Sequence, residues 1–237
     1  MAEIIQQNFQ RVLSHISTAA SKVGRTIGDV KLVVVTKGQP LEKIIAVLAV
    51  GANRLGENYA EEAISKIQNI PAEFQPEWHM IGHIQSRKAR NVCEKFDWVH
   101  SLDSLKLATR LNHFAHEFER KLPVLLEFNV GGESTKSGFL AQEQSKWPDF
   151  LLDIEAILEL PSLQVCGLMV IPPFDPDPEA ARPYFRQARL LREYLKKNIP
   201  SCEWYELSMG MSNDYEIAIQ EGATIVRIGQ AILGERK

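Results

Sequence analysis

The chain alternates between two hydrophobic patterns. Short runs of apolar, often β-branched residues are bounded by Gly, Pro or Asn, and between them lie longer stretches in which apolar residues recur every three or four positions. The short runs predict buried strands and the longer stretches predict amphipathic helices. Eight strands are predicted in this way, at residues 31–36, 53–57, 77–82, 98–101, 123–130, 163–171, 204–208 and 223–228.

Helices are predicted before the first strand and between successive strands. Their ranges are 2–23, 41–50, 59–70, 105–120, 148–160, 178–197 and 214–220, with one more basic helix that contains Arg87, Lys88 and Arg90. Eight strands alternating with helices are typical of a TIM-type (β/α)8 barrel, here with an extra N-terminal helix. An open doubly wound sheet stays as the alternative. Because no linker interrupts the alternation, residues 1–237 are predicted to form a single domain.

Composition narrows the class of protein. A net charge of −3 and 45% hydrophobic residues give no reason to expect nucleic acid or membrane as a partner. The three cysteines, Cys93, Cys166 and Cys202, lie far apart and are predicted to be reduced packing residues. The chain shows neither a secretion signal nor an apolar run near the roughly 18 to 20 residues of a membrane span. We therefore expect a cytoplasmic protein.

The first predicted strand ends in a lysine. Val33-Val34-Val35-Thr36 leads into Lys37, and Gly38 and Pro40 end the strand. Burying an ammonium is costly, and the usual relief is a lowered pKa, which makes the amine a nucleophile that can form a Schiff base with an aldehyde. For this position alone, a lysine that simply points into water is the competing interpretation.

Glycine-bearing turns follow the last two predicted strands, where αβ barrels commonly bind phosphate. After the seventh strand, in the stretch SMGMSND, Gly210 allows a close bend and Ser212 can open the next helix. After the eighth strand, Gly229 allows the backbone to approach a ligand closely. Either turn alone is explained by a helix cap or a tight turn. Together with Lys37 they predict a site for a phosphorylated aldehyde, such as pyridoxal 5'-phosphate (PLP).

Three stretches resemble a known family. They are Val35-Thr36-Lys37, the run WHMIGHIQSRKARNV at residues 78–92, and SMGMSND together with VRIG near the C-terminal end. The chain resembles, nearly from end to end, the pyridoxal phosphate homeostasis protein family, single-domain relatives of the alanine racemase barrel. The resemblance implies that the cofactor-binding residues are Lys37, Asn58, Met211, Ser212, Arg227, Gly229 and Gln230.

The resemblance also implies a role for most of these residues. Lys37 would form the internal aldimine, and Asn58 would lie near the ring. Ser212, with the backbone at Gly229 and Gln230, would hold the phosphate.

Arg227 matches the arginine that faces the pyridine nitrogen in the racemase barrel. A permanent charge there disfavours protonation of that nitrogen and makes the ring a poorer electron sink. Racemases also take a second acid–base group from a β domain of a partner subunit, which we expect this chain to lack. The resemblance therefore implies a PLP-binding protein of intracellular PLP homeostasis without strong catalytic activity. We expect a monomer with PLP-dependent apoenzymes as recipients of the cofactor.

Two other functions stay open. One is a PLP-dependent, racemase-like enzyme of low activity. The other is a phosphate-sugar barrel enzyme in which Lys37 forms a Schiff base with the substrate itself. Lys136, in the loop after the fifth strand, could contact the phenolic oxygen of the cofactor, act as a second aldehyde acceptor or be a surface lysine.

Two further motifs are interpreted as structural. His79 and His83 are four residues apart, but on a strand this spacing is about 13 Å, so no metal site is predicted. His79 is expected to pack in its strand and His83 to lie at the barrel rim. The basic run Arg87-Lys88-Arg90 is expected to be a solvated helix face.

Overall fold

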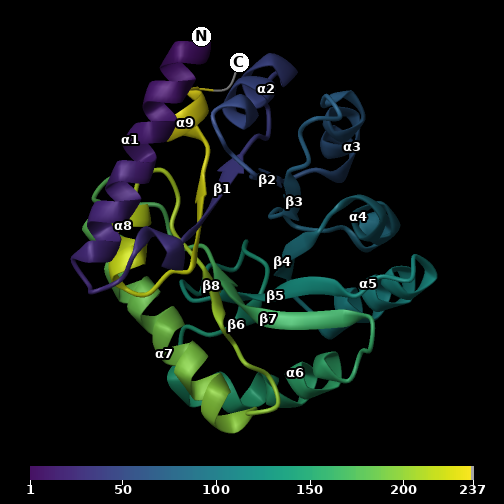
Figure 1. Ribbon diagram of the computed structural model, residues 1–237. Coiled ribbons are helices and arrows are strands. Elements are labelled where there is room, and N and C mark those ends of the chain that lie inside the picture. The colour runs from purple at the N-terminus through teal and green to yellow at the C-terminus, as the bar shows by residue number, and fades with distance from the viewer. Residues whose placement is uncertain (236–237) are drawn as a thin grey trace.

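Eight parallel strands close into a barrel in the computed structural model, which describes residues 1–235 (Figure 1). Strand β1 pairs with both β2 and β9, and β4 pairs with β5, so the ring has no open edge. This closure confirms the predicted (β/α)8 barrel and excludes the open sheet. The barrel strands are β1 (Lys31–Val35), β2 (Arg54–Glu57), β3 (Glu77–Met80), β4 (Trp98–Leu102), β5 (Leu122–Asn129), β7 (Leu163–Val170), β8 (Glu206–Ser208) and β9 (Ile225–Ile228).

Helices surround the barrel (Figure 1). They are α1 (Ala2–Ser21), α2 (Leu41–Ala49), α3 (Ala60–Asn69), α4 (Ala89–Lys95), α5 (Leu105–Glu117), α6 (Leu151–Leu158), α7 (Arg182–Asn198), α8 (Tyr215–Gln220) and α9 (Gln230–Leu233). The N-terminal helix α1 packs against α2, α8 and α9 and buries Ile5, Phe9, Val12 and Ile16 against them. Within residues 1–235, no helix is both long and apolar enough to cross a bilayer.

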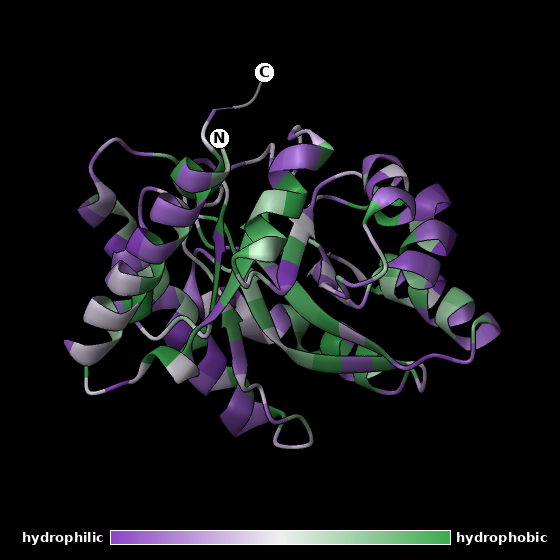
Figure 2. Cartoon of the chain, turned by 45° about the horizontal axis from the view of Figure 1, so that its top comes forward, coloured by the Kyte–Doolittle hydropathy of each residue, from purple (hydrophilic) through white to green (hydrophobic). Residues whose placement is uncertain are grey.

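The barrel wall separates two apolar clusters. Side chains alternate between the two faces of a strand, so Val33 on β1 points into the barrel and Val34 points toward the helices. The inner cluster is small and comprises Val33, Leu125, Cys166, Met169 and Ile225, while the outer cluster fills the layer between strands and helices. Figure 2 shows the hydrophobic residues concentrated in the central strands and many of the hydrophilic ones on the surrounding helices.

Three local features differ from the sequence prediction. The strand β6 (Phe139–Leu140) pairs with β5 beside the ring, and its two residues are too few to show an alternating pattern. Arg87 and Lys88 lie in the 3-10 turn η2 (Ser86–Lys88), and only Arg90 lies in α4.

The helix predicted at 148–160 begins instead as the 3-10 segment η3 (Gln144–Phe150), which contains Pro148, and becomes α-helical at Leu151. Proline cannot donate a backbone hydrogen bond within a helix, so the regular α6 starts only after it.

Candidate functional site

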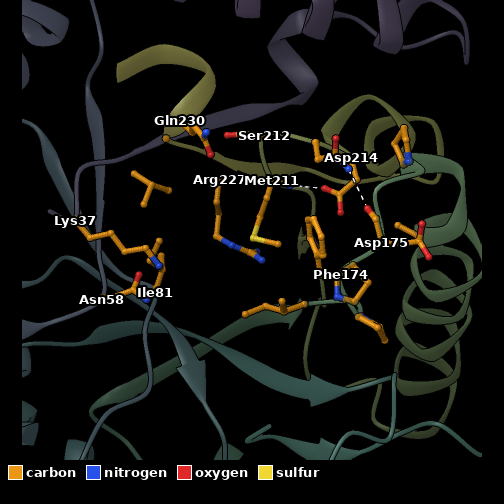
Figure 3. Close-up of a pocket in the computed structure, with 18 of the residues that line it drawn as sticks. Lys37, Asn58, Ile81, Phe174, Asp175, Met211, Ser212, Asp214, Arg227 and Gln230 are labelled. Carbon is orange, nitrogen blue, oxygen red and sulfur yellow. Dashed lines mark hydrogen bonds between the residues drawn. The ribbon is translucent and has the colours of Figure 1, made fainter. Parts of the chain in front are cut away.

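A cavity of about 380 Å³ lies at the C-terminal ends of the barrel strands (Figure 3). Parallel strands in a barrel all end on one face, so segments far apart in the sequence meet there. The structure brings together at this cavity all seven residues that the sequence singled out: Lys37, Asn58, Met211, Ser212, Arg227, Gly229 and Gln230.

Lys37 lies two residues after the end of β1 and lines the cavity. Its side chain extends toward Asn58 and Ile81 in Figure 3. The next residue, Gly38, has a φ of +67°, a conformation that glycine adopts readily and other residues rarely adopt. The chain therefore turns away immediately after Lys37, which leaves the amine at the end of the strand.

Two glycines allow neighbouring strand ends to approach each other closely. A Cβ atom at Gly82 would lie 2.5 Å from the backbone oxygen of Asn58, and a Cβ atom at Gly229 would lie 2.9 Å from the backbone oxygen of Val35. Both distances are too short for a methyl group, so only glycine permits this packing. The backbone at Gly229 consequently forms part of the cavity wall.

Polar groups from the last two barrel strands gather at one end of the cavity. Figure 3 shows Ser212 and Gln230 beside each other, and the backbone N–H of Ala231 donates to Ser212 Oγ at 3.4 Å. At the turn after β8, Gly210 has a φ of +94°, and the backbone N–H of Met211 donates to Asp214 Oδ1 at 2.6 Å. A serine hydroxyl and closely approaching backbone are groups that bind phosphate oxygens.

Arg227 places a buried cation in the wall of the cavity. The side chain points inward from β9, and the residue is 4% exposed. Its Nη1 donates to Ser208 Oγ at 2.6 Å and its Nη2 to the backbone oxygen of Val170 at 3.0 Å. Burial lowers the pKa of Arg227 to about 10, while the carboxylates of Asp214 and Glu127 oppose the shift. Arg227 therefore remains charged at neutral pH.

A chain of polar groups continues from Arg227 through the barrel interior. His100 Nδ1 lies 3.0 Å from Ser208 Oγ, and His100 Nε2 lies 2.9 Å from His79 Nδ1. Burial lowers the pKa of His79 to about 3 and that of His100 well below its ordinary value, so both rings are neutral. Alternate residues on a strand share a face, which is why His79, His100, Ser208 and Arg227 all reach the interior.

Arg227 can only donate, so Ser208 Oγ accepts from it. The Ser208 hydroxyl forms a second hydrogen bond with His100 Nδ1. The direction of that bond, and of the bond between His100 Nε2 and His79 Nδ1, follows the tautomer of His100. Ser208 Oγ and the backbone oxygen of Val170 both accept from the guanidinium and so stabilise its charge inside the barrel.

Glu127 is an interior carboxyl that the sequence analysis missed. It lies on β5, and its Oε2 has no hydrogen-bond partner among the described residues. Burial raises the pKa of Glu127 to about 7; Asp103 adds to the shift, while Arg227 and Lys136 oppose it. The alternation of β5 shows in retrospect that Glu127 shares the inward face with Leu125.

The remaining candidates lie outside the cavity. Lys136 donates to the backbone oxygen of Pro172 at 3.0 Å and pairs with Glu133, so it ties the loop after β5 to the loop after β7. His83 is exposed at the rim, as predicted, with its Nδ1 3.1 Å from Asp103 Oδ2. Within residues 1–235, no group of three or more His, Cys, Asp or Glu side chains is arranged to hold a metal ion.

Comparisons with known proteins show matches over almost the whole chain. The family model for the alanine racemase N-terminal domain matches residues 5–237. The chain is 41% identical over 236 residues to the pyridoxal phosphate homeostasis protein of Vibrio alginolyticus, covering 98% of this chain and 97% of that protein. It is 38% identical over 240 residues to the protein of the same name from Escherichia coli (strain K12), covering 98% and 97%.

Two solved structures also resemble this chain along most of its length. PipY of Synechococcus elongatus, solved with PLP bound, matches with a TM-score of 0.83 and 32% identity, covering 97% of this chain and all of that chain (100%). An alanine racemase of Clostridium difficile 630 matches with a TM-score of 0.69 but only 16% identity, covering 95% of this chain and 56% of the racemase. At that identity the likeness shows the fold alone.

Proposed function

We propose that this chain, which belongs to the pyridoxal phosphate homeostasis protein family, binds PLP in the strand-end cavity and takes part in intracellular homeostasis of that cofactor. The proposal rests on one observation: the same cavity is lined by the amine of Lys37, the buried cation of Arg227, and the polar groups of Ser212, Gly229 and Gln230.

The residues of the cavity fit this cofactor. PLP needs an amine for its aldehyde, donors for its phosphate and a slot for its ring. The close approach of Gly229 to Val35 makes the Gly229 backbone part of the cavity wall, where it can reach a phosphate. In the proposed site, Lys37 would take the aldehyde, and Ser212 with the backbone at Gly229 and Gln230 would hold the phosphate. Asn58 and Met211 would border the ring, and Arg227 would face the pyridine nitrogen; all of these residues line the cavity.

When bound, PLP supplies an aldehyde that reacts reversibly with amines and a ring that can withdraw electrons. The charge of Arg227 would limit the electron-withdrawing power of the ring. Its buried charge disfavours a second positive charge on the pyridine nitrogen, at about 1.4 kcal/mol for each unit by which the pKa of that nitrogen falls. The protein would thus retain the aldehyde chemistry needed to hold PLP. Since Arg227 matches an arginine of the racemase barrel, the distinction between a carrier and an enzyme rests on the proton donor across the ring.

The cavity also offers little for catalysis of racemisation. A racemase needs a proton donor across the ring from the lysine. Among the described residues, the side chains that line the cavity include no Tyr, His or Cys. The three aspartates in the lining, Asp175, Asp177 and Asp214, each accept a hydrogen bond from a backbone N–H group, which favours their ionised form. We therefore propose a carrier rather than an enzyme, acting as a monomer in the cytoplasm and passing PLP to PLP-dependent apoenzymes. The three buried free thiols suit a reducing compartment.

An absorbance spectrum of the PLP-loaded protein tests the proposal. Wild-type protein is expected to show a near-visible band, which Lys37→Ala abolishes because it removes the amine. Lys136→Ala is the matched control, since Lys136 lies near the same face of the barrel but outside the cavity. A band that persists in Lys37→Ala would refute the proposed site, and a loss in Lys136→Ala instead would transfer the role to that lysine.

A further inference from the structure

We propose that Glu62 and Lys66 are positioning residues that hold the backbone on both sides of Lys37 and so aim its amine into the cavity. This inference rests on the proposed function, in which Lys37 takes the aldehyde of PLP. The residues involved come from the end of β1, the end of β2 and helix α3: Thr36, Glu57, Glu62 and Lys66, here called the Lys66 cluster.

Lys66 is at the centre of the cluster, and the residue is only 8% exposed. Its ammonium donates to three oxygens, each at 2.6 Å: the backbone oxygen of Thr36, Glu57 Oε1 and Glu62 Oε1. An ammonium has three N–H groups, so every donor of Lys66 is used. One of these three N–H groups donates to the backbone oxygen of Thr36, the residue just before Lys37.

Glu62 binds the residue on the other side of Lys37. Its Oε1 accepts from the backbone N–H of Gly38 at 2.6 Å, as well as from Lys66. The residues before and after Lys37 are thus bound to the same ion pair. Since Gly38 is also the point where the chain turns, at a φ of +67°, Glu62 fixes the turn that leaves Lys37 at the cavity wall.

Glu57 connects the cluster to the end of the neighbouring strand β2. Its side chain is fully buried and accepts from Lys66 and from Thr36 Oγ1, each at 2.6 Å. Burial raises the pKa of Glu57, and the bonds from Lys66 and Thr36 oppose the shift. The next residue in the chain is Asn58, which lines the cavity. The Lys66 cluster therefore fixes Lys37 and Asn58 relative to each other.

Stability alone does not explain this arrangement. Buried ion pairs often contribute no more to stability than apolar residues of the same volume would. They do provide short, directional, charge-assisted hydrogen bonds, and these orient the groups that they bind. Here the oriented groups are the peptide units that flank the reactive lysine, where a small displacement of the amine would slow its attack on an aldehyde.

The test compares Glu62→Ala, Glu62→Gln and Lys66→Met with the wild type. Glutamine keeps an oxygen that can accept from Gly38, whereas alanine does not. The double variant Glu57→Gln/Lys66→Met removes the ion pair without leaving a buried carboxylate alone. Glu143→Ala removes an exposed ion pair, with Lys146, far from the site in sequence and serves as the control.

Two measurements separate capture of the aldehyde from binding of the phosphate. One is the rate at which PLP becomes covalently attached, and the other is the affinity for pyridoxine 5'-phosphate, which has an alcohol in place of the aldehyde. We expect Glu62→Ala, Lys66→Met and the double variant to slow attachment by about tenfold to a hundredfold. The affinity for pyridoxine 5'-phosphate should stay within about twofold, and Glu62→Gln should resemble the wild type.

A third measurement needs no cofactor. In the cofactor-free protein, hydrogen exchange at the Gly38 amide should accelerate in Glu62→Ala and stay slow in Glu62→Gln and Glu143→Ala. Unchanged attachment rates in all variants would overturn the inference, and so would an equal loss of attachment and of pyridoxine 5'-phosphate affinity. If the wild type itself attached no PLP, the proposed function would fail, while Gly38 exchange would still report whether the cluster holds the turn.

Discussion

Arg227 shows how one residue sets the chemistry of the cavity. A guanidinium buried to 4% exposure keeps its charge because Ser208, the backbone of Val170 and the nearby carboxylates surround it with acceptors and negative charge. The neutral histidines behind Ser208 extend this support through the barrel without adding competing charge. The charge that we propose to face the cofactor ring is therefore fixed by the protein interior.

A second single residue, Glu127, gives a testable prediction about stability and pH. Its pKa is raised from 4.5 to about 7, so between these values the folded protein keeps a proton that the unfolded chain releases. Its contribution to stability is complete below pH 4.5 and is lost as the pH rises toward 7. Glutamine cannot ionise, so Glu127→Gln lacks this loss of stability. The free energy of unfolding of the variant minus that of wild type should therefore rise by up to about 3 kcal/mol between pH 4.5 and pH 7.

Urea unfolding of both proteins from pH 4.5 to pH 8 measures this difference. The control is Glu155→Gln, which changes an exposed glutamate on α6. A difference between Glu127→Gln and wild type that stays flat across this range would mean that folding does not raise the pKa of Glu127.

At the scale of elements, the glycines that end the strands determine how closely the loops pack. A Cβ atom at Gly82 would lie 2.5 Å from the backbone of Asn58, and the nearest atoms there cannot move without shifting β2. We expect Gly82→Ala to lower stability by about 1 to 3 kcal/mol and to weaken PLP binding, because the Asn58 backbone must yield. Thermal unfolding and a PLP titration measure the two effects.

Gly28 provides the matched control for this substitution. A Cβ atom there would meet Thr26 Oγ1 at an ordinary 3.6 Å. Gly28→Ala should change neither stability nor binding appreciably. Equal behaviour of the two variants would show that the close approach at Gly82 has no role in shaping the site.

The elements that the sequence predicted well are those with a long or strongly patterned apolar run. The helix predicted at 2–23 and the strand predicted at 31–36 differ from α1 and β1 only at their ends. The two-residue β6 and the 3-10 turn η2 carry no such pattern, because pairing with neighbours and loop geometry define them rather than local periodicity. Sequence reasoning therefore missed or misplaced them.

At the scale of the whole molecule, barrel closure explains which parts of the site were predictable. Lys37, Ser212 and Gly229 could be selected from the sequence because each lies just after a predicted strand, and a barrel brings such positions to one face. The chain from Arg227 to His79 and the Lys66 cluster could not, since they depend on strand register and on which helix covers which strand end. Those relations exist only in the closed ring.

The proposed carrier role also belongs to this scale. With no Tyr, His or Cys among the described cavity-lining residues, PLP-loaded protein incubated with L-alanine should not racemise it at ordinary enzyme rates. Polarimetry over hours, with Lys37→Ala as the blank, measures this. Turnover of about 1 per second or faster would favour the racemase-like alternative.

The account depends most on which amine holds the cofactor. Borohydride reduction of the PLP-loaded protein, followed by peptide mapping by mass spectrometry, locates that amine directly because reduction makes the attachment permanent. We expect the pyridoxyl group on the peptide that contains Lys37, and on no other lysine at comparable yield. A label confined to Lys136 or any other lysine, or no label at all, would contradict the account.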